Sequence, residues 1–451
     1  MIEYQMTIEE KRKLILTRNS NYVSLMEKLP VFLNLHNGLN KSARFWEIIL
    51  YKFIHKFVHD ITPLVFEKDT DTLTERVFDE VLIPLDDNDY SNLRHQEPAF
   101  FQQFLYSVDL KKSIKAKHNF KRTRIQFLKN WLFKFRAFLP SKKQKMLLFQ
   151  EYYSSIWQHY YPEYKIIKVG LRLTERDDTI KINTELRQEL RDFLITEGFT
   201  PVLANGLSFS FPMDLLEGFS YHNAKVAKFT KGIKIDSMLA GWIPELWTAI
   251  LCASYVESGV ELRLVQHGGS YGESDYSFGD LIEQRLCDQF LSWSQKSYNE
   301  KIVPVIPTRL VAFRLKYQAT IKKIEGPNLR RYPVLIVDGM HYSTPTVSDL
   351  VGWAGTKENV VSFIESYMEG KGEGVLLRLY NGNYAKDEKF HEELIRRFPN
   401  LTIHDETHPL EVDLFCCQEV YVNYMFSTLK WEANFIGKTV KTLPGLAENA
   451  L

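Results

Sequence analysis

The sequence predicts an α/β protein of two domains, preceded by a helical N-terminal region. The chain has 451 residues, which is too many for one hydrophobic core, so two or three domains are expected. Apolar residues make up 45% of it and charged residues 25%, which is typical of folded chains and not of disordered ones. From about residue 164, short apolar runs alternate with helical patterns, which favours parallel sheets covered by helices on both faces.

The first 160 residues are predicted to be helical. The strongest pattern lies in residues 42–58, where large apolar side chains recur at helical spacing and Ser42 is placed to cap the first turn. These apolar positions are Phe45, Ile48, Ile49, Phe53 and Phe57.

The first sheet is expected after this helical region, within an N-terminal domain of residues 1–300. Apolar runs typical of strands occupy residues 164–173, 224–229, 260–265 and 289–294. A helix is expected over residues 237–257, because Gly259 follows it and glycine commonly ends a helix.

A second α/β domain is expected over residues 331–451, after a connector at residues 301–330. Its predicted strands are residues 333–337, 374–380 and 420–423, and its predicted helices are residues 355–369, residues 386–398 and one that runs from Ser427 to Gly437. Two such domains predict a cleft between them, and ligands of parallel sheets bind at the carboxyl ends of the strands.

Charge and cysteine content limit the partners and the compartment. A net charge of +1 excludes a globally basic nucleic-acid-binding protein, so no nucleic acid is expected as a partner. Cys252, Cys287, Cys416 and Cys417 show no Cys-x-x-Cys spacing, which favours a reducing compartment. The N-terminus has no apolar signal region, and no stretch reaches the roughly 18 apolar residues of a membrane span. The cytoplasm is therefore the expected location.

The main candidate site is the histidine loop, residues 266–272, with the sequence Gln-His-Gly-Gly-Ser-Tyr-Gly. Gly268, Gly269 and Gly272 are expected to permit positive φ angles and a close approach of the backbone to a ligand. His267 follows an apolar strand, a place that suits a proton donor or a group that stabilises negative charge. A tight turn with a structural histidine is the alternative.

Two further segments carry candidate residues. Asp236 precedes the expected helix and is either its cap or a free carboxylate, since Ser237 can also serve as the cap. Ser427 and Thr428 open the last predicted helix, where hydroxyls and backbone N–H groups hold phosphate well. Glu432 lies one turn further on, and capping is the alternative explanation for this segment.

An arginine in the second domain also needs a partner, whereas several known motifs are absent. Arg378 ends an apolar run, so its partner is expected to be a ligand anion or an internal acid. The sequence has no convincing metal-ligand spacing, no phosphate-binding P-loop, no dinucleotide motif and no Gly-x-Ser-x-Gly. No metal or other cofactor is therefore expected.

The segment 111–145 has an unusual charge, with thirteen Lys or Arg residues and no acid. Within residues 121–139 the apolar residues share one helical face: Ile125, Leu128, Trp131, Leu132, Phe135, Phe138 and Leu139. Such a helix can lie on an anionic membrane or attract a polyanionic substrate. A core helix with a basic outer side is the alternative.

Residues 234–294 resemble a family of bacterial sugar transferases from surface-polysaccharide loci. The matching elements are Asp236, Trp247, Glu257-Ser258-Gly259, the histidine loop and Leu291-Ser292-Trp293. Weaker matches are Arg44-Phe45-Trp46, Arg378-Leu379-Tyr380 and the Ser427-Thr428…Glu432-Ala433…Gly437 end motif. The family is similar to the retaining β-Kdo transferases of capsule and lipopolysaccharide assembly, which have the GT-B fold of two Rossmann-like domains around a cleft.

This resemblance implies a CMP-sugar donor, held mainly by the C-terminal domain, and an acceptor on the side of the N-terminal domain. It implies catalytic roles for Asp236 as nucleophile, His267 and Glu163. The residues that it implies for donor binding are Gln266, Gly268, Gly269, Tyr271, Arg378, Ser427, Thr428 and Glu432. The family's Arg-x-Tyr-Pro-His motif is incomplete here, because Asn381-Gly382 follows Tyr380 and His408-Pro409 occurs only later.

The resulting hypothesis is a retaining glycosyltransferase that moves an ulosonic acid, Kdo, from CMP to a lipid-linked or oligosaccharide acceptor through an Asp-sugar intermediate. Residues 121–139 would bring it to the inner face of the cytoplasmic membrane. One alternative is an inverting GT-B enzyme that uses a UDP- or GDP-sugar. The other is a non-catalytic glycan- or lipid-binding scaffold.

Overall fold

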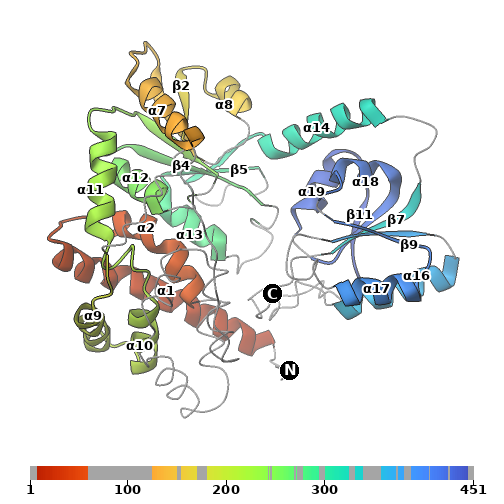
Figure 1. The fold of residues 1–451 in the computed structure, drawn as a ribbon, viewed down its shortest axis with the longest axis horizontal. Helices are drawn as coiled ribbons and strands as arrows, with labels where there is room; N and C mark the ends of the chain where they lie inside the picture. Colours follow the sequence, from red (N-terminus) through yellow and green to blue (C-terminus); the bar gives the residue numbers. More distant parts are fainter. Residues whose placement is uncertain are drawn as a thin grey trace. The chain divides into compact units, whose positions relative to one another are not determined.

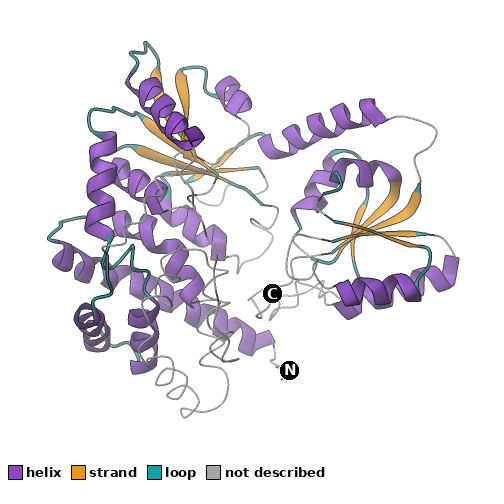
Figure 2. Ribbon diagram, viewed as in Figure 1, coloured by secondary structure: helices purple, strands orange, loops and turns teal. Residues whose placement is uncertain are grey.

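The computed structural model describes residues 8–58, 124–149, 154–169, 180–241, 243, 246–268, 271, 278–293, 300–324, 331–338, 357–371, 374–379, 388–405, 407–424 and 427–444. The chain forms two compact units, which Figures 1 and 2 show. The N-terminal unit comprises Leu16–Val265 and Leu281–Leu291, and the C-terminal unit comprises Met1–Ile15, Gln266–Asp280 and Ser292–Leu451.

The helices before the first sheet and between its strands are α1 (Ile8–Asn37), α2 (Ala43–Lys56), α7 (Arg124–Phe138), α8 (Ser154–Tyr160), α9 (Thr184–Thr196), α10 (Pro201–Ser210), α11 (Phe219–Thr230), α12 (Leu246–Glu257) and α13 (Phe278–Leu286). The helix predicted at residues 42–58 is confirmed, since the Ser42 hydroxyl accepts the N–H of Phe45 at the start of α2. The buried residues Phe45, Trp46 and Ile49 lie on α2, which packs against α12.

The first sheet has six strands in the order β2-β1-β3-β4-β5-β6. The strands are β1 (Gln144–Phe149), β2 (Tyr164–Val169), β3 (Ser237–Ala240), β4 (Glu261–Val265), β5 (Gln289–Ser292) and β6 (Ile302–Pro304). The pairs from β2 to β5 are parallel, so these strands all end at the same edge of the sheet. β2, β4 and β5 confirm the strands predicted at 164–173, 260–265 and 289–294, although residues 170–173 lie outside the described part of the chain.

Three sequence predictions in this region are wrong. Residues 144–149, expected to be helical, form the interior strand β1. Residues 224–229, expected as a strand, belong to α11, whose buried residues Phe219, His222 and Val226 recur at helical spacing. Residues 237–257 are not one helix: the buried strand β3 comes first, and α12 begins only after Pro244, which disfavours a continuous helix.

The second sheet has five parallel strands in the order β11-β10-β7-β8-β9. They are β7 (Tyr332–Val337), β8 (Val375–Arg378), β9 (Leu401–His404), β10 (Cys417–Val422) and β11 (Val440–Thr442). When these five strands are numbered 1 to 5 along the chain and the sheet is read from β9 to β11, their order is 3-2-1-4-5. This is a Rossmann-like arrangement, and its switch point lies between β7 and β10. β7, β8 and β10 confirm the three strands predicted in this domain.

Helices cover both faces of this second sheet (Figure 2). One buried cluster joins the sheet to α16 (Lys357–Lys371) and α17 (Glu388–Arg397) through Val360, Ile364 and Leu394. The other joins it to α14 (Thr308–Ile324), α18 (Leu410–Cys416) and α19 (Thr428–Phe435), with Phe313 and Leu414 among its members. The parallel strands therefore present one shared carboxyl edge, where Asp338, Arg378, His404 and Asn423 lie at or just after strand ends.

Candidate functional site

The histidine loop is fixed to the C-terminal unit by a buried glutamine. The Gln266 side chain donates to the carbonyl of Gly268 at 2.8 Å and accepts hydrogen bonds from the Ser292 hydroxyl at 2.8 Å and the Trp293 N–H at 3.0 Å. It is only 2% exposed. Gln266 therefore holds the loop in shape, and the donor contact that the resemblance implies for it stays a prediction.

His267 is half-buried and its ring is oriented by Tyr271. The Tyr271 hydroxyl lies 2.8 Å from Nδ1 of His267, and the tyrosine ring itself is buried. When this hydroxyl donates to Nδ1, the proton of a neutral imidazole lies on Nε2. A histidine held in this tautomer can donate to an anionic oxygen or pass a proton to it.

The loop lies against the start of α19. A Cβ built on Gly268 would lie 3.8 Å from the Thr428 hydroxyl oxygen and 3.5 Å from the ring of Tyr271, which are ordinary contact distances. Gly268 does not adopt a positive φ, so the expected reason for this glycine is wrong at this position. Gly269 and Gly272 lie outside the described residues. Thr428 and the histidine loop, far apart in the sequence, are thus neighbours.

The start of α19 has the features of an anion site. Ser427 occupies the N-cap position, yet its side chain makes no capping hydrogen bond. The first N–H groups of a helix have no partner within the helix and carry partial positive charge. α19 follows β10 beside the switch point of the second sheet, which is where ligands of such sheets bind. The phosphate contact predicted for Ser427 and Thr428 stays a prediction, and the missing capping bond of Ser427 disfavours the capping alternative.

Arg309 joins these two parts, and sequence reasoning missed it. Its guanidinium donates from Nη1 to the His267 carbonyl at 2.6 Å and from Nε to the Glu432 carboxylate at 2.9 Å. Arg309 is the second residue of α14, and Glu432 lies in α19. In the sequence it is one of several basic residues of the connector, so no local signal separated it from the others.

Glu432 is an internal partner of Arg309, and its position is five residues past the N-cap. This position does not fit the capping alternative, and the donor contact predicted for Glu432 stays a prediction. Burial raises the pKa of Glu432 above its usual value, while the positive charge of Arg309 acts in the opposite direction. Arg309 therefore favours the charged form of this carboxyl group against the effect of burial.

Arg378 is also bound to an internal acid. Its guanidinium pairs with the carboxylate of Asp413 in α18, which is 1% exposed, and the same carboxylate contacts His404. The sequence left open a ligand or an internal partner, and the structure supplies the internal one. Arg378 is consequently placed to order the carboxyl edge of the sheet.

The two predicted carboxylates lie at the edge of the first sheet where its strands begin. Asp236 immediately precedes β3, where its side chain accepts the Lys145 N–H at 2.7 Å. Glu163 is exposed and immediately precedes β2. Both therefore lie where parallel strands begin, whereas the histidine loop follows the end of β4. Asp236 and Glu163 thus lie at the edge of the first sheet opposite the end of β4, and the catalytic roles that the resemblance implies for them stay predictions.

Two Rossmann-like sheets covered by helices define an α/β protein of two parts, in which the histidine loop lies near the start of α19. The model of the LIC12162 family transferases matches residues 90–430. The chain therefore belongs to the LIC12162 family of transferases. None of the curated proteins matches it in sequence.

Solved structures with a similar arrangement share little sequence with this chain. The UDP-GlcNAc 2-epimerase of Methanocaldococcus jannaschii, solved with UDP-GlcNAc and UDP, has 11% identity and a TM-score of 0.37, over 66% of this chain and 83% of that one. The S. aureus MnaA–UDP structure has 13% identity and a TM-score of 0.35, over 66% and 78%. A UDP-glucosyltransferase from Polygonum tinctorium has 8% identity and a TM-score of 0.32, over 67% and 80%.

Proposed function

We propose that this transferase is a glycosyltransferase whose nucleotide-sugar donor places its phosphate at the start of α19, against the histidine loop. The observation that carries this proposal is that Gly268 lies near Thr428, whose hydroxyl oxygen would be 3.8 Å from a Cβ built on the glycine. A phosphate bound there would be close to the histidine loop, to the Thr428 hydroxyl and to the N-terminus of α19. These groups neutralise a phosphate that leaves with negative charge, and they do so without a metal ion.

The donor proposed from the sequence resemblance is a CMP-activated ulosonic acid, with Kdo as the sugar and a lipid-linked or oligosaccharide acceptor. In a retaining reaction a carboxylate attacks the anomeric carbon as the bond to the CMP phosphate breaks. The acceptor hydroxyl then displaces the carboxylate and loses its proton. The carboxylate that the resemblance implies is Asp236, which precedes β3. The acid that the sequence offers between the end of β3 and the start of α12 is Glu245, which lies outside the described residues.

Calorimetry with CMP, UDP and GDP tests the donor site. We expect one of them to bind, and Thr428→Val to weaken its binding about tenfold because a charge-assisted hydrogen bond is lost. Thr439→Val is the matched control, since Thr439 is exposed and precedes the first residue of β11, at the other edge of the same sheet. Binding of none of the three nucleotides would contradict the proposal and favour a scaffold.

A nucleotide-sugar screen, beginning with CMP-Kdo generated in the assay, then identifies the sugar. The anomeric configuration of the product, measured by NMR, separates retention from inversion. Loss of the covalent adduct in Glu245→Gln, with nucleotide binding unchanged, would identify the nucleophile.

The structure also supports a membrane contact through α7. Trp131 and Phe135 are 53% and 50% exposed and their rings stack at 5.4 Å, while Phe133 and Ala137 face inward. Trp131 and Phe135 belong to the apolar face expected at residues 121–139. Among the side chains that the structure describes in α7, this face is therefore exposed. Aromatic side chains among basic residues suit the interface of an anionic membrane. Among the described helices, none has the length and apolarity to cross a bilayer.

Co-sedimentation with vesicles tests this contact. We expect binding to vesicles that contain phosphatidylserine and little to neutral ones, with a loss of at least fivefold in Trp131→Ala/Phe135→Ala. Leu35→Ala serves as the control, because Leu35 is 83% exposed on α1. Equal binding to both vesicle types would argue against the contact.

A further inference from the structure

We propose that His404, His408 and Asp413 form a binding site for a divalent cation of the Zn²⁺ type. This site goes beyond the proposed function and is independent of it, since the donor site described above uses none of these residues.

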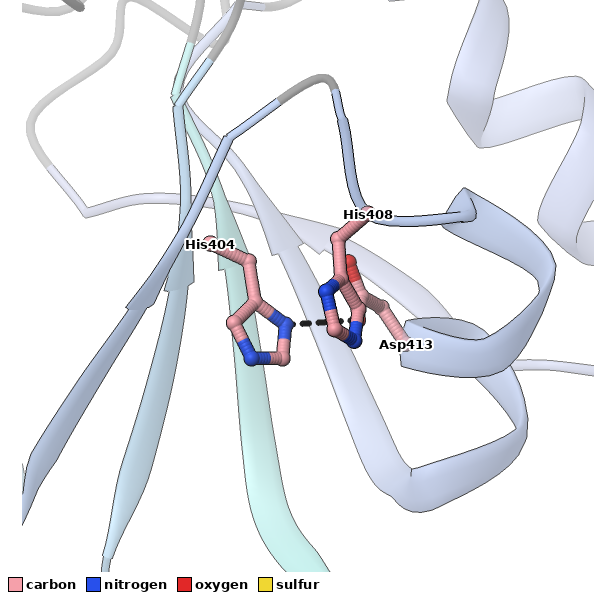
Figure 3. Close-up of side chains that lie close together, drawn as sticks. All are labelled: His404, His408 and Asp413. Carbon is pink, nitrogen blue, oxygen red and sulfur yellow. Dashed lines mark hydrogen bonds and ion pairs between the residues drawn. The ribbon is translucent and has the colours of Figure 1, made fainter.

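The three side chains converge from consecutive parts of the C-terminal unit (Figure 3). His404 ends β9, His408 lies in the loop that follows, and Asp413 lies in α18. Each offers one ligand atom, and these atoms all lie within 4.8 Å of one another. Nδ1 of His404 is 2.8 Å from a carboxylate oxygen of Asp413, and the two imidazole rings stack with their centres 3.8 Å apart.

The donor set determines the kind of ion. Two imidazole nitrogens and one carboxylate oxygen suit Zn²⁺ and related metals, whereas Ca²⁺ and Mg²⁺ prefer oxygen ligands alone. Three protein ligands leave a fourth position of a tetrahedral ion for water or another oxygen. Without an ion, the His404–Asp413 hydrogen bond contains one proton. For Nδ1 of a neutral His404 to bind the ion through its lone pair, the single ring proton must be on Nε2, so a ring that donates from Nδ1 to Asp413 changes tautomer when the ion replaces this hydrogen bond.

The surroundings of Asp413 fit a metal ligand but also limit the affinity. Arg378 pairs with the second carboxylate oxygen, Oδ2, which leaves Oδ1 directed at His404. Carboxylates that bind metals are usually held by such an outer partner. The positive charge of Arg378 opposes a cation, so we expect weaker binding than in zinc sites with four protein ligands. A bound ion would tie the His408 loop to the end of β9, beside Pro409 at the start of α18.

The test uses the full chain without a polyhistidine tag, stripped of metal with a chelator. We expect one equivalent of Zn²⁺ to bind by calorimetry, and Co²⁺ to give the visible absorption of a four- or five-coordinate ion with nitrogen ligands. His408→Ala should weaken binding at least tenfold and abolish the absorption. His408 is exposed, so this variant is expected to fold, and circular dichroism checks that it does. His159→Ala, which removes an exposed histidine of the N-terminal unit, is the control.

Equal Zn²⁺ binding by the wild-type chain and His408→Ala would overturn the proposal, as would the absence of Co²⁺ absorption in the wild type. Asp413→Asn provides a second reading, because it keeps the shape of the side chain and removes the charge of the ligand. Nucleotide calorimetry on the metal-free chain separates this proposal from the proposed function, since loss of either binding event leaves the other measurable.

Discussion

Arg309→Ala is expected to lower both stability and sugar transfer. The change removes the cation that contacts the carboxylate of Glu432, whose side chain is 10% exposed, and frees the carbonyl of His267. Breaking a fully buried pair costs about 3–5 kcal/mol, and Arg309 is 41% exposed, so about 2 kcal/mol is expected here. Transfer should fall about a hundredfold, because the histidine loop loses its tie to α14 and α19.

The stability loss should also depend on pH. Burial raises the pKa of Glu432, so the folded state binds this proton more tightly than the unfolded chain does. The stability that such a group contributes is fully present below its unfolded pKa and is lost as pH rises through the folded pKa. Arg309 lowers that pKa, and its removal raises it further. Arg309→Ala should therefore lose less stability at about pH 5 than at about pH 7.5, measured by thermal and urea unfolding.

Two matched variants separate charge from geometry. Glu432→Gln keeps an oxygen that accepts from Nε of Arg309 and removes the buried charge, so it should remain close to wild type in stability at neutral pH. Arg309→Lys keeps the charge, but its single ammonium cannot reproduce the two directed contacts, so transfer should stay low. If Arg309→Ala kept full transfer and full stability, the contacts of Arg309 with His267 and Glu432 would contribute to neither.

The sequence predicted the strands best where a short apolar run stood between turns. The runs that became β4, β5, β7 and β10 are short, apolar and β-branched in part, and they follow turns. Residues 224–229 form a short run rich in apolar residues, but the burial of Phe219, His222 and Val226 in the surrounding segment decides for a helix. Such a decision depends on the partner surface, which local patterns do not contain.

The candidate site was predictable only in part, for a topological reason. The histidine loop and the Ser427-Thr428 start of α19 each carry a local signal, and the structure places them together. The position of Asp236 was not predictable, because an acid before an apolar run precedes either a helix or a strand. Since it precedes β3, it lies at the edge of the sheet where the strands begin. Arg309 has no local signal at all, because its role depends on contacts with residues 42 and 123 positions away.

His267→Ala is expected to reduce the rate of transfer while nucleotide binding is largely kept. A side chain that donates to, or protonates, a leaving group contributes about 10²–10⁴-fold to kcat. The phosphate contacts proposed for Ser427, Thr428 and the start of α19 remain in this variant, so the dissociation constant of the nucleotide should change less than about threefold. Steady-state kinetics and nucleotide calorimetry on the same preparation measure the two effects separately.

Two controls define what this loss means. Tyr271→Phe removes only the hydroxyl that contacts Nδ1 of His267. The imidazole is then less well oriented, so kcat should fall about tenfold.

Asp236→Ala should keep transfer within about threefold and lose about 1 kcal/mol of stability, because the Lys145 N–H loses its acceptor. A folded but inactive Asp236→Ala would contradict the reading that its edge of the sheet lies away from the chemistry. A parallel loss of nucleotide binding and kcat in His267→Ala would instead assign His267 to ground-state binding of the donor, and the transfer step would then need another proton donor at the carboxyl edge.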